Sequence, residues 1–355
     1  MIEIRTYDGD GEDVADLTAR TWRAAYGGKN WCPFWSAEHI RWQLLSGRPA
    51  DRDFLVAAYD GCRLVGCFFA ERTTFRADNR EVVGTIGSWF TVDPQARSPR
   101  LGIDIIEELR RRHCEHGAAF LLGYVNGNPK TPANKFWTCY AELYPGQIRF
   151  VRRIGYWIRI LNSASLRRKC VHWFERFAAR VHGRLPFLGA PRGMAPEVRD
   201  YAGGDLNRCG SLVGEMSENS DLAMIWSRDR MASQLDWNGF PRSLVLDRGD
   251  APFGMVNYHR FGLLGADVVT TGLIDLLGCE GGSVRDQRRL LRSAVARMAS
   301  DGLDIAMALR TSMFPPRVMV PCGFWPLPQS EHLVYVFPRP DLRLPPADRP
   351  FILFR

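Results

Sequence analysis

A short run with two arginines and a glycine has the residue types of an anion site. Arg97, Arg100 and Gly102 lie where a β-rich stretch gives way to a helical pattern, in the run Phe90-Thr91-Val92-Asp93-Pro94-Gln95-Ala96-Arg97-Ser98-Pro99-Arg100-Leu101-Gly102-Ile103. A helix N-terminus presents unpaired N–H groups and a partial positive charge. Glycine permits close backbone approach, and guanidinium groups match phosphate oxygens. The run suits a diphosphate; the alternative is a solvent-facing turn with two arginines.

Other catalytic and metal motifs are weak or missing in the sequence. His113-Cys114-Glu115-His116 has metal-ligand types, but it falls in the last turn of a predicted helix, where histidines satisfy terminal carbonyl groups. The sequence contains no Cys-x-x-Cys pair, Gly-x-Ser-x-Gly elbow or Walker loop. We therefore expect no metal cofactor.

Composition indicates a globular chain whose positive charge is local. The chain has 355 residues, 46% of them hydrophobic and 24% charged, which suits two domains. Its formal charge is +8, but residues 151–193 hold ten Arg or Lys against the single acid Glu175, so the rest is near neutral and no DNA partner is expected. Nine scattered cysteines indicate reduced thiols and a cytoplasmic location. The first residues lack the apolar core of a signal peptide.

The order of predicted elements repeats, which indicates an internal duplication. Each half starts with a strand and a helical pattern and continues with a hairpin around a glycine turn. A buried strand, an amphipathic helix, a glycine and a second buried strand follow. The matched segments are 3–7 and 197–201, 54–69 and 243–256, 82–92 and 268–277, 103–114 and 284–299, and 120–125 and 305–309. A Gly-aromatic pair, Gly155-Tyr156 or Gly323-Phe324, follows in each half.

Because helices follow strands within each unit, we predict an α/β fold with mixed sheets, formed by tandem duplication. We expect an N-terminal domain at residues 1–162, a basic linker at 163–193 and a C-terminal domain at 194–355.

This order of elements resembles the GNAT superfamily of N-acetyltransferases, in a tandem two-domain form. The run from Phe90 to Ile103 is similar to the family's strand-to-helix signature, in which a Val-x-Pro stretch leads to Arg/Gln-x-x-Gly-x-Gly/Ala. Arg97 and Gly102 fall on the pattern, Arg100 replaces its middle glycine, and Ser98-Pro99 departs from it. The matching run of the second half, residues 279–284, has glycines but no cation, so the resemblance implies that only the first half binds acyl-CoA.

The resemblance implies an acyl-CoA-dependent N-acyltransferase. Its co-substrate is expected to be acetyl-CoA or another acyl-CoA, and its acceptor a small-molecule amine such as an amino sugar or amino acid derivative. The residues implied to contact coenzyme A are Phe90, Thr91, Val92, Arg97, Ser98, Pro99, Arg100, Leu101, Gly102, Ile103 and Asn126. Backbone N–H groups around Phe90 to Val92 are implied to hold the pantetheine arm and polarise the carbonyl.

Acyl transfer to an amine also needs a general base. The acids nearest the central strand are Glu71, on the neighbouring hairpin strand, and Glu81, at the strand start. Each is alternatively a solvated edge charge, and a water chain ending on Ser88 is a further option.

The proton donor for the leaving thiolate is a second open role. The family commonly has a tyrosine four residues before the Gly-aromatic pair, but Val151 stands there. Tyr124, Tyr140 and Tyr144 are the substitutes. Two of them lie on an insert, 126–148, that is either a lid over the acceptor or a packed surface loop.

Apolar residues of the linker follow helical spacing, with cations on the other faces. They are Leu166, Cys170, Trp173, Phe174, Phe177 and Val181. Such a helix can lie on an anionic membrane surface, here through residues 166–188, or bind a polyanion. The alternative is that its apolar face packs between the two domains while its cations are solvated.

Two other functions fit the same pattern. Fem-type aminoacyl-tRNA-dependent transferases also pair two such domains, and the basic linker could hold RNA. A non-catalytic scaffold or membrane-surface protein is the third hypothesis.

Overall fold

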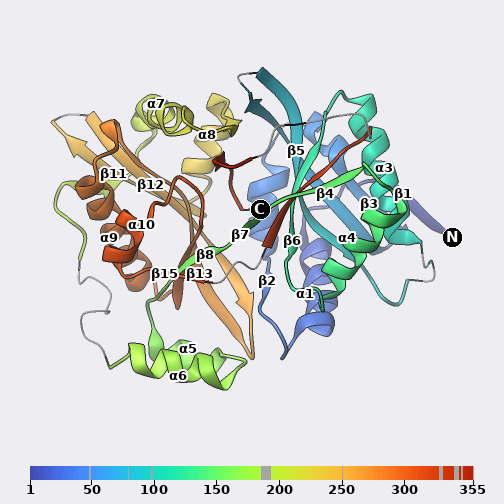
Figure 1. The fold of residues 1–355 in the computed structure, drawn as a ribbon, viewed down its shortest axis with the longest axis horizontal. Coiled ribbons are helices and arrows are strands. Elements are labelled where there is room, and N and C mark those ends of the chain that lie inside the picture. The colour runs from blue at the N-terminus through green and yellow to red at the C-terminus, as the bar shows by residue number, and fades with distance from the viewer. Residues whose placement is uncertain are drawn as a thin grey trace.

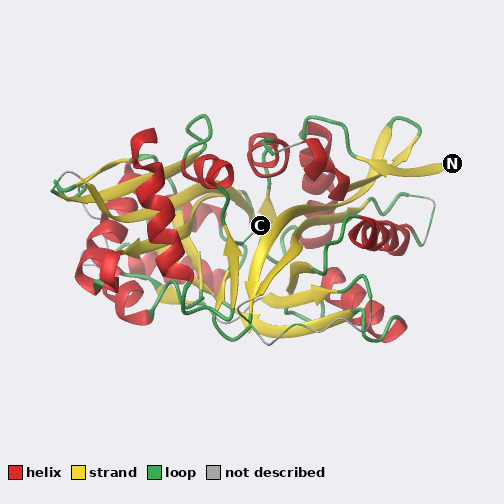
Figure 2. Ribbon diagram, turned by 90° about the horizontal axis from the view of Figure 1, so that it is seen from above, coloured by secondary structure: helices red, strands yellow, loops and turns green. Residues whose placement is uncertain are grey.

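The structure is a computed structural model in which residues 1–47, 49–78, 80–96, 98, 100–184, 193–249, 251–327, 331–339, 344 and 347–354 are described. Two sheets form its centre and helices surround them (Figures 1 and 2). The N-terminus lies at one outer edge, whereas the C-terminal end lies near the middle, between the two sheets (Figure 1). The mixed α/β class and the duplication are confirmed, as the order of strands shows.

The first sheet follows the order β1, β3, β4, β5, β6, β16, β7. These strands are β1 (Ile2–Thr6), β3 (Leu55–Asp60), β4 (Arg63–Ala77), β5 (Arg80–Val92), β6 (Leu121–Asn126), β16 (Glu331–Val336) and β7 (Ile148–Ile154). Neighbours on this path are antiparallel except β5 and β6, which run parallel. Helix α1 (Glu12–Tyr26) and the short α2 (Ala37–Ile40) pack on one face, and α3 (Leu101–Glu115) and α4 (Pro132–Leu143) cover the other.

The second sheet repeats this order with its own strands. They are, from one edge to the other, β9 (Val198–Asp200), β11 (Pro241–Arg248), β12 (Ala251–Leu264), β13 (Val268–Cys279), β14 (Ile305–Leu309), β8 (Tyr156–Ile160) and β15 (Trp325–Pro326). Only β13 and β14 are parallel neighbours on this path. Its helices are α7 (Leu206–Ser217), α8 (Arg228–Leu235), α9 (Val284–Ser300) and α10 (Pro316–Met319).

The two halves exchange strands. β16, from the end of the chain, stands between β6 and β7 in the first sheet, and β8, from the first half, takes the equivalent place beside β14. Likewise β2 (Cys32–Phe34) pairs with β12, and β10 (Leu222–Ile225) pairs with β4 and with β17 (Pro350–Phe351). The segments 1–162 and 194–355 therefore share one large core. Tyr156 begins an exchanged strand whereas Phe324 precedes the edge strand β15, so the two Gly-aromatic pairs are not structural equivalents.

Local sequence explains the elements that were predicted. Both predicted hairpins form, β3–β4 and β11–β12, and their turns place Gly61 and Gly249 at φ of 63° and 68°, which glycine adopts without steric cost. The amphipathic helices predicted after the two central strands form as α3 and α9. The buried face of α3 consists of residues at helical spacing, Leu101, Ile105, Ile106 and Leu109.

The linker does not form a single helix. It breaks at Cys170–His172 into α5 (Ser163–Lys169) and α6 (Trp173–His182), and residues 185–192 lie outside the described part. Leu166 and Cys170 are buried, but the aromatic residues of α6 are exposed. The predicted alternative, in which the whole apolar face of the linker packs between the two domains, is therefore wrong for α6, whose aromatic side chains face solvent. Within the described residues, no helix is long and apolar enough to cross a membrane.

Candidate active site

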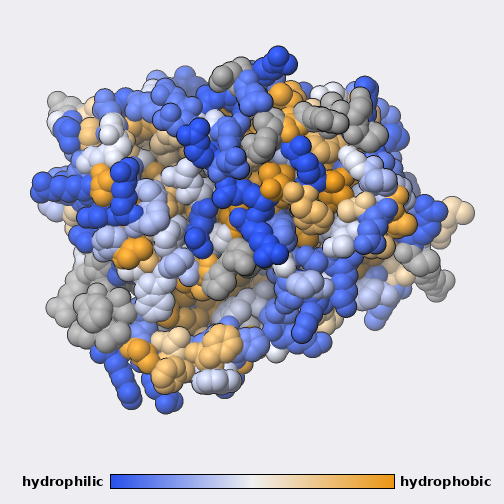
Figure 3. All heavy atoms as spheres, in the orientation of Figure 1, coloured by the Kyte–Doolittle hydropathy of each residue, from blue (hydrophilic) through white to orange (hydrophobic). Residues whose placement is uncertain are grey.

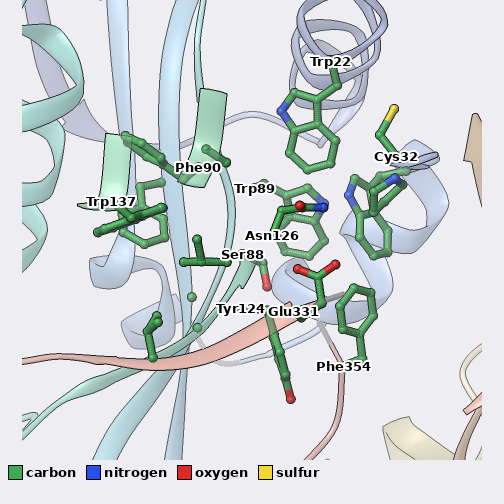
Figure 4. Close-up of a pocket in the computed structure, with 18 of the residues that line it drawn as sticks. Trp22, Cys32, Ser88, Trp89, Phe90, Tyr124, Asn126, Trp137, Glu331 and Phe354 are labelled. Atoms are coloured by element: carbon green, nitrogen blue, oxygen red, sulfur yellow. The ribbon is translucent and has the colours of Figure 1, made fainter. Parts of the chain in front are cut away.

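The parallel strands β5 and β6 separate soon after they meet. Their register pairs are Thr85 with Leu121 and Ile86 with Leu122. Beyond these pairs, residues 87–90 of β5 and 123–126 of β6 line a cavity of about 190 Å³ (Figure 4). A gap between two strands offers backbone N–H and C=O groups to an extended ligand, which can pair with them as an added strand does.

A β-bulge in β5 lies at this cavity. Thr91 pairs with Cys67 and Ser88 with Phe69, so Trp89 and Phe90 together face the single residue Phe68 on β4. Trp89 has a φ of 57°, a left-handed conformation that costs a bulky residue on the order of 1–3 kcal/mol. Such strain persists where the surroundings hold it, and bulges often redirect backbone groups beside functional sites. The cavity thus opens where β5 changes direction.

The cavity passes through the first sheet, because residues of both faces line it. On the face covered by α3 and α4 these are Phe68, Phe90, Leu121, Val125, Trp137, Val334 and Val336. On the face of α1 they are Trp22, Trp31, Trp35, Trp89, Tyr124 and Phe354. A largely apolar channel with a few polar groups is a typical small-molecule site.

Glu331 brings a carboxyl group into this channel. It lies on the exchanged strand β16, opposite Asn126 of β6. Its side chain points into the cavity near Trp89, Tyr124 and Asn126 (Figure 4). No ion pair or hydrogen bond among the described residues holds this carboxyl group. Burial raises the pKa of Glu331 to about 8, which is suitable for a general base near neutral pH.

Three polar residues expected from the sequence share the cavity with Glu331. The Ser88 hydroxyl is buried and has no hydrogen-bond partner among the described residues. The Tyr124 hydroxyl donates to the carbonyl oxygen of Leu353 at 2.7 Å. The Asn126 side-chain oxygen accepts from the backbone N–H of Asn128 at 2.9 Å, so its amide is fixed at the cavity edge.

No protein-family model matches the chain, and no curated protein resembles it in sequence. Among solved structures, the N-myristoyltransferase of Saccharomyces cerevisiae with bound myristoyl-CoA has a TM-score of 0.76 at 15% identity, over 100% of this chain and 89% of that one. A conserved protein of Enterococcus faecalis V583, described as a probable N-acyltransferase, has a TM-score of 0.52 at 8% identity, over 95% of this chain and 73% of that one. A GCN5-related N-acetyltransferase from Anabaena variabilis ATCC 29413 has a TM-score of 0.52 at 9% identity, over 94% and 72%.

The chain has the duplicated GNAT fold. The order of elements in the sequence predicted this fold, and the prediction is confirmed. At identities of 15% or less, a structural likeness establishes the fold alone.

Four of the expected catalytic residues lie away from the cavity, and two of them, Glu71 and Glu81, are on strands of the sheet. Glu71 forms an ion pair with Arg230, and both Glu71 and Glu81 line a separate cavity of about 680 Å³ between β4 and α8. The reason is their position along β4 and β5. Glu71 pairs with Ile86 and Glu81 with Arg76, and both pairs precede the point where β5 and β6 separate.

The two insert tyrosines are likewise placed elsewhere. The Tyr140 hydroxyl donates to Glu107 at 2.9 Å. Tyr144, at the end of α4, contacts the Tyr140 ring with 4.7 Å between ring centroids. The insert is a packed helix whose Trp137 forms part of the cavity wall.

The expected diphosphate loop of the GNAT fold is described only in part. Arg97 and Pro99 lie outside the described residues, Ser98 is half-buried, and Arg100 is exposed as the N-cap of α3, with no side-chain hydrogen bond at that cap. A side chain at Gly102 would lie 3.3 Å from the rings of Phe90 and Phe136, so this glycine makes room for aromatic packing. Further along, Leu101 is buried and Ile103 is half-buried.

The strand end before the loop is firmly anchored. Thr91 and Val92 pair with Cys67 and Gly66 on β4. Asp93 then accepts from Arg20 at 3.0 Å and from Arg63 at 2.6 Å.

The corresponding region of the second half is closed. β13 and β14 stay paired from Thr271 and Ile305 to Ile274 and Ala308, twice the length of the β5–β6 pairing. Ser283 caps α9 by accepting from the Asp286 N–H, and Glu280 pairs with Arg208. The helix N-terminus is thus satisfied by the chain itself.

Sequence reasoning missed Glu331, Trp89 and Phe354. Glu331 lies on a strand that the sequence order assigns to the second half, and only the strand exchange brings it to the first sheet. The signal that could have found it is an acid at the start of the apolar run that forms β16, residues 331–336.

Proposed function

We propose that this protein is an acyl-CoA-dependent N-acyltransferase that transfers an acyl group to an amine. The observation that carries the proposal is the separation of β5 and β6 at a bulge, with an unpaired, half-buried carboxyl group on the next strand. The bound myristoyl-CoA of the yeast neighbour supports acyl-CoA, rather than an aminoacyl-tRNA, as the donor.

The donor enters, in this proposal, from the face of α3. Its diphosphate lies at the N-terminus of α3 beside Arg100, where backbone N–H groups and the helix dipole favour anions. The pantetheine arm then runs between β5 and β6. The thioester carbonyl reaches the bulge at Trp89 and Phe90, where backbone N–H groups polarise it.

The amine arrives from the opposite face, where Glu331 and Asn126 lie. The Glu331 carboxylate accepts a proton from the amine, and the nitrogen attacks the thioester carbon. Collapse of the tetrahedral intermediate forms the amide bond, breaks the C–S bond and releases the thiolate of coenzyme A, which takes up a proton. The Ser88 hydroxyl is an unpaired group in the cavity that can relay a proton from water to the thiolate, while Glu331 returns its proton to solvent.

We further propose a short acyl group, acetyl first, and a small amine acceptor such as an amino sugar or amino acid derivative. The cavity of about 190 Å³ must hold the acyl group together with the end of the pantetheine arm. The rings of Trp22, Trp31 and Trp35 suit stacking on a sugar or aromatic amine. The cytoplasmic location stays a prediction.

The test is release of free coenzyme A from acyl-CoA donors of increasing chain length, with amino sugars, amino acids and short peptides as acceptors. We expect turnover with a short acyl group, and a loss of about a hundredfold or more in Glu331→Gln. Glu81→Gln, a carboxyl group in the other cavity, is the matched control and should retain activity. Folded protein that releases no coenzyme A with any pair would contradict the proposal.

A further inference from the structure

Helices α5 and α6 form a hairpin that projects from one end of the molecule, at the bottom of Figure 1. The outer face of α6 carries Trp173, Phe174, Phe177 and Val181, which are 78%, 54%, 60% and 40% exposed. These residues follow one another at helical spacing, so they form a single stripe. A space-filling view shows hydrophobic side chains gathered at this end beside hydrophilic ones (Figure 3). Such a stripe is costly in water and marks a contact surface.

The exposure of this stripe is fixed by the opposite face of α6. Ala179 and His182 are buried against the rest of the protein. Glu175 turns inward as well: it accepts from the Trp31 indole at 2.6 Å and from the His172 N–H at 3.0 Å. These inward contacts leave the aromatic side chains facing solvent.

The α5–α6 hairpin is also strongly basic. Arg167, Arg168, Arg180 and Arg184 are exposed, and none of them forms an ion pair with any described residue. The acid of this segment, Glu175, is the one turned inward. The outward charge of the hairpin is therefore positive, next to an apolar stripe.

We propose that the α5–α6 hairpin docks on the surface of an anionic lipid bilayer. Trp and Phe side chains enter the headgroup region of a bilayer, and flanking arginines are attracted to anionic lipids. The stripe favours lipid over a nucleic acid because it includes the aliphatic Val181 and continues to Trp325, 38% exposed, which contacts His182 with 5.5 Å between ring centroids. Bases of an RNA would stack on the flat rings, but they would leave the aliphatic Val181 uncovered.

Docking places the bilayer beside the candidate active site. Trp31 bonds to Glu175 of α6 and also lines the cavity. A lipid-dissolved or amphipathic substrate would therefore reach the cavity over a short path. Bilayer docking itself does not depend on the proposed activity and is measured without it.

The test is co-sedimentation of the full chain with vesicles of phosphatidylcholine alone or mixed with phosphatidylglycerol. We expect at least about tenfold tighter binding to the anionic vesicles, weakened by added salt. Two paired variants, Trp173→Ser with Phe177→Ser and Arg167→Glu with Arg168→Glu, should each lower binding by about tenfold or more. Because these side chains are exposed, the variants should melt at the temperature of the parent protein.

Matched controls are Phe150→Ser and Arg153→Glu, exposed residues of β7, which should bind as the parent does. The proposal would be overturned if the protein bound both vesicle types with equal affinity, or if the control variants lost as much vesicle binding as the paired variants. Binding of a random RNA by protein that does not bind vesicles would also overturn it.

Discussion

Glu331 of β16 lies directly opposite Asn126 of β6, and the side chains of both line the channel through the first sheet. Cross-strand partners point to the same face of a sheet, so an acid from the end of the chain meets an amide from its first half. The exchange of β16 creates this pair. Neither half of the chain alone contains the complete candidate site.

The pH dependence of turnover follows from the raised pKa of Glu331. As the base, its carboxylate is the active form, so kcat/KM should rise with pH and level off above about 8. An acceptor whose own pKa lies well below neutrality removes the titration of the amine from this profile. Glu331→Gln should flatten the rise, and a profile with the same inflection in that variant would assign it to another group.

The same residue should make the protein less stable as pH rises. The pKa of Glu331 increases from its ordinary value of 4.5 to about 8 on folding, so between these values the folded state binds the extra proton. The free energy of unfolding therefore falls as pH rises through this window. Glu331→Gln should remove that fall and be more stable above pH 8, by at most about 5 kcal/mol at about 1.4 kcal/mol per pKa unit.

Urea titrations of both proteins at several pH values measure this difference. Loss of activity together with a gain in stability would separate catalysis from folding. Equal free energies of unfolding of the two proteins at high pH would show that the ionised Glu331 carboxylate does not destabilise the folded state.

Arg100 should act through the diphosphate of the donor. Arg100→Glu places a negative charge at the N-terminus of α3 and should weaken binding of acetyl-CoA by about tenfold. Binding of acetyl-pantetheine, which lacks the diphosphate, should stay the same. A similar loss for both ligands would mean that the variant disturbs the cavity and not an anion site.

The reactivity of the thiols should follow their burial. Cys62, Cys114 and Cys139 are exposed, whereas the other six cysteines are buried. Burial raises the pKa of Cys32 and Cys170 to about 11, which suppresses the reactive thiolate. We expect a thiol reagent at pH 8 to label three cysteines rapidly and the remaining six only in denaturant. Rapid labelling of more than three in the native protein would contradict the buried positions.

The sequence predicts the elements better than it predicts the site. The hairpins, α3 and α9 follow from glycine turns and from apolar spacing, which act within a few residues. The exchange of β8 and β16 cannot be predicted in this way. The apolar residues of a strand such as 331–336 would be buried equally well in either sheet, so the pattern does not choose between them. Glu71 and Glu81 line a separate cavity for a different reason, which is their position along β4 and β5 before β5 and β6 separate.

The bulge at Trp89 could not be predicted from the sequence either. Its left-handed φ goes with the bulge and with ring contacts to Trp35 and His39, at centroid distances of 5.5 Å and 5.9 Å, and no local signal in the sequence requires it. The same limit applies to α6, whose apolar spacing was predicted but whose exposure depends on Glu175 and Trp31, distant in sequence.

The central claim is that the space between β5 and β6 receives an acyl-CoA. A Cβ atom at Gly123 would make ordinary contacts, 3.5 Å from Leu121, 3.7 Å from Val334 and 3.9 Å from the Gly87 carbonyl oxygen. The two methyl groups of Gly123→Val add further bulk at the gap. The most direct measurement is calorimetric titration of acetyl-CoA into the parent protein and into this variant, with Gly210→Ala on α7 as the control. We predict saturable binding at one site in the parent and the control, and a loss of tenfold or more, approximately, in Gly123→Val. Folded parent protein that binds no acetyl-CoA or longer acyl-CoA, or binding that Gly123→Val leaves intact, would contradict the account.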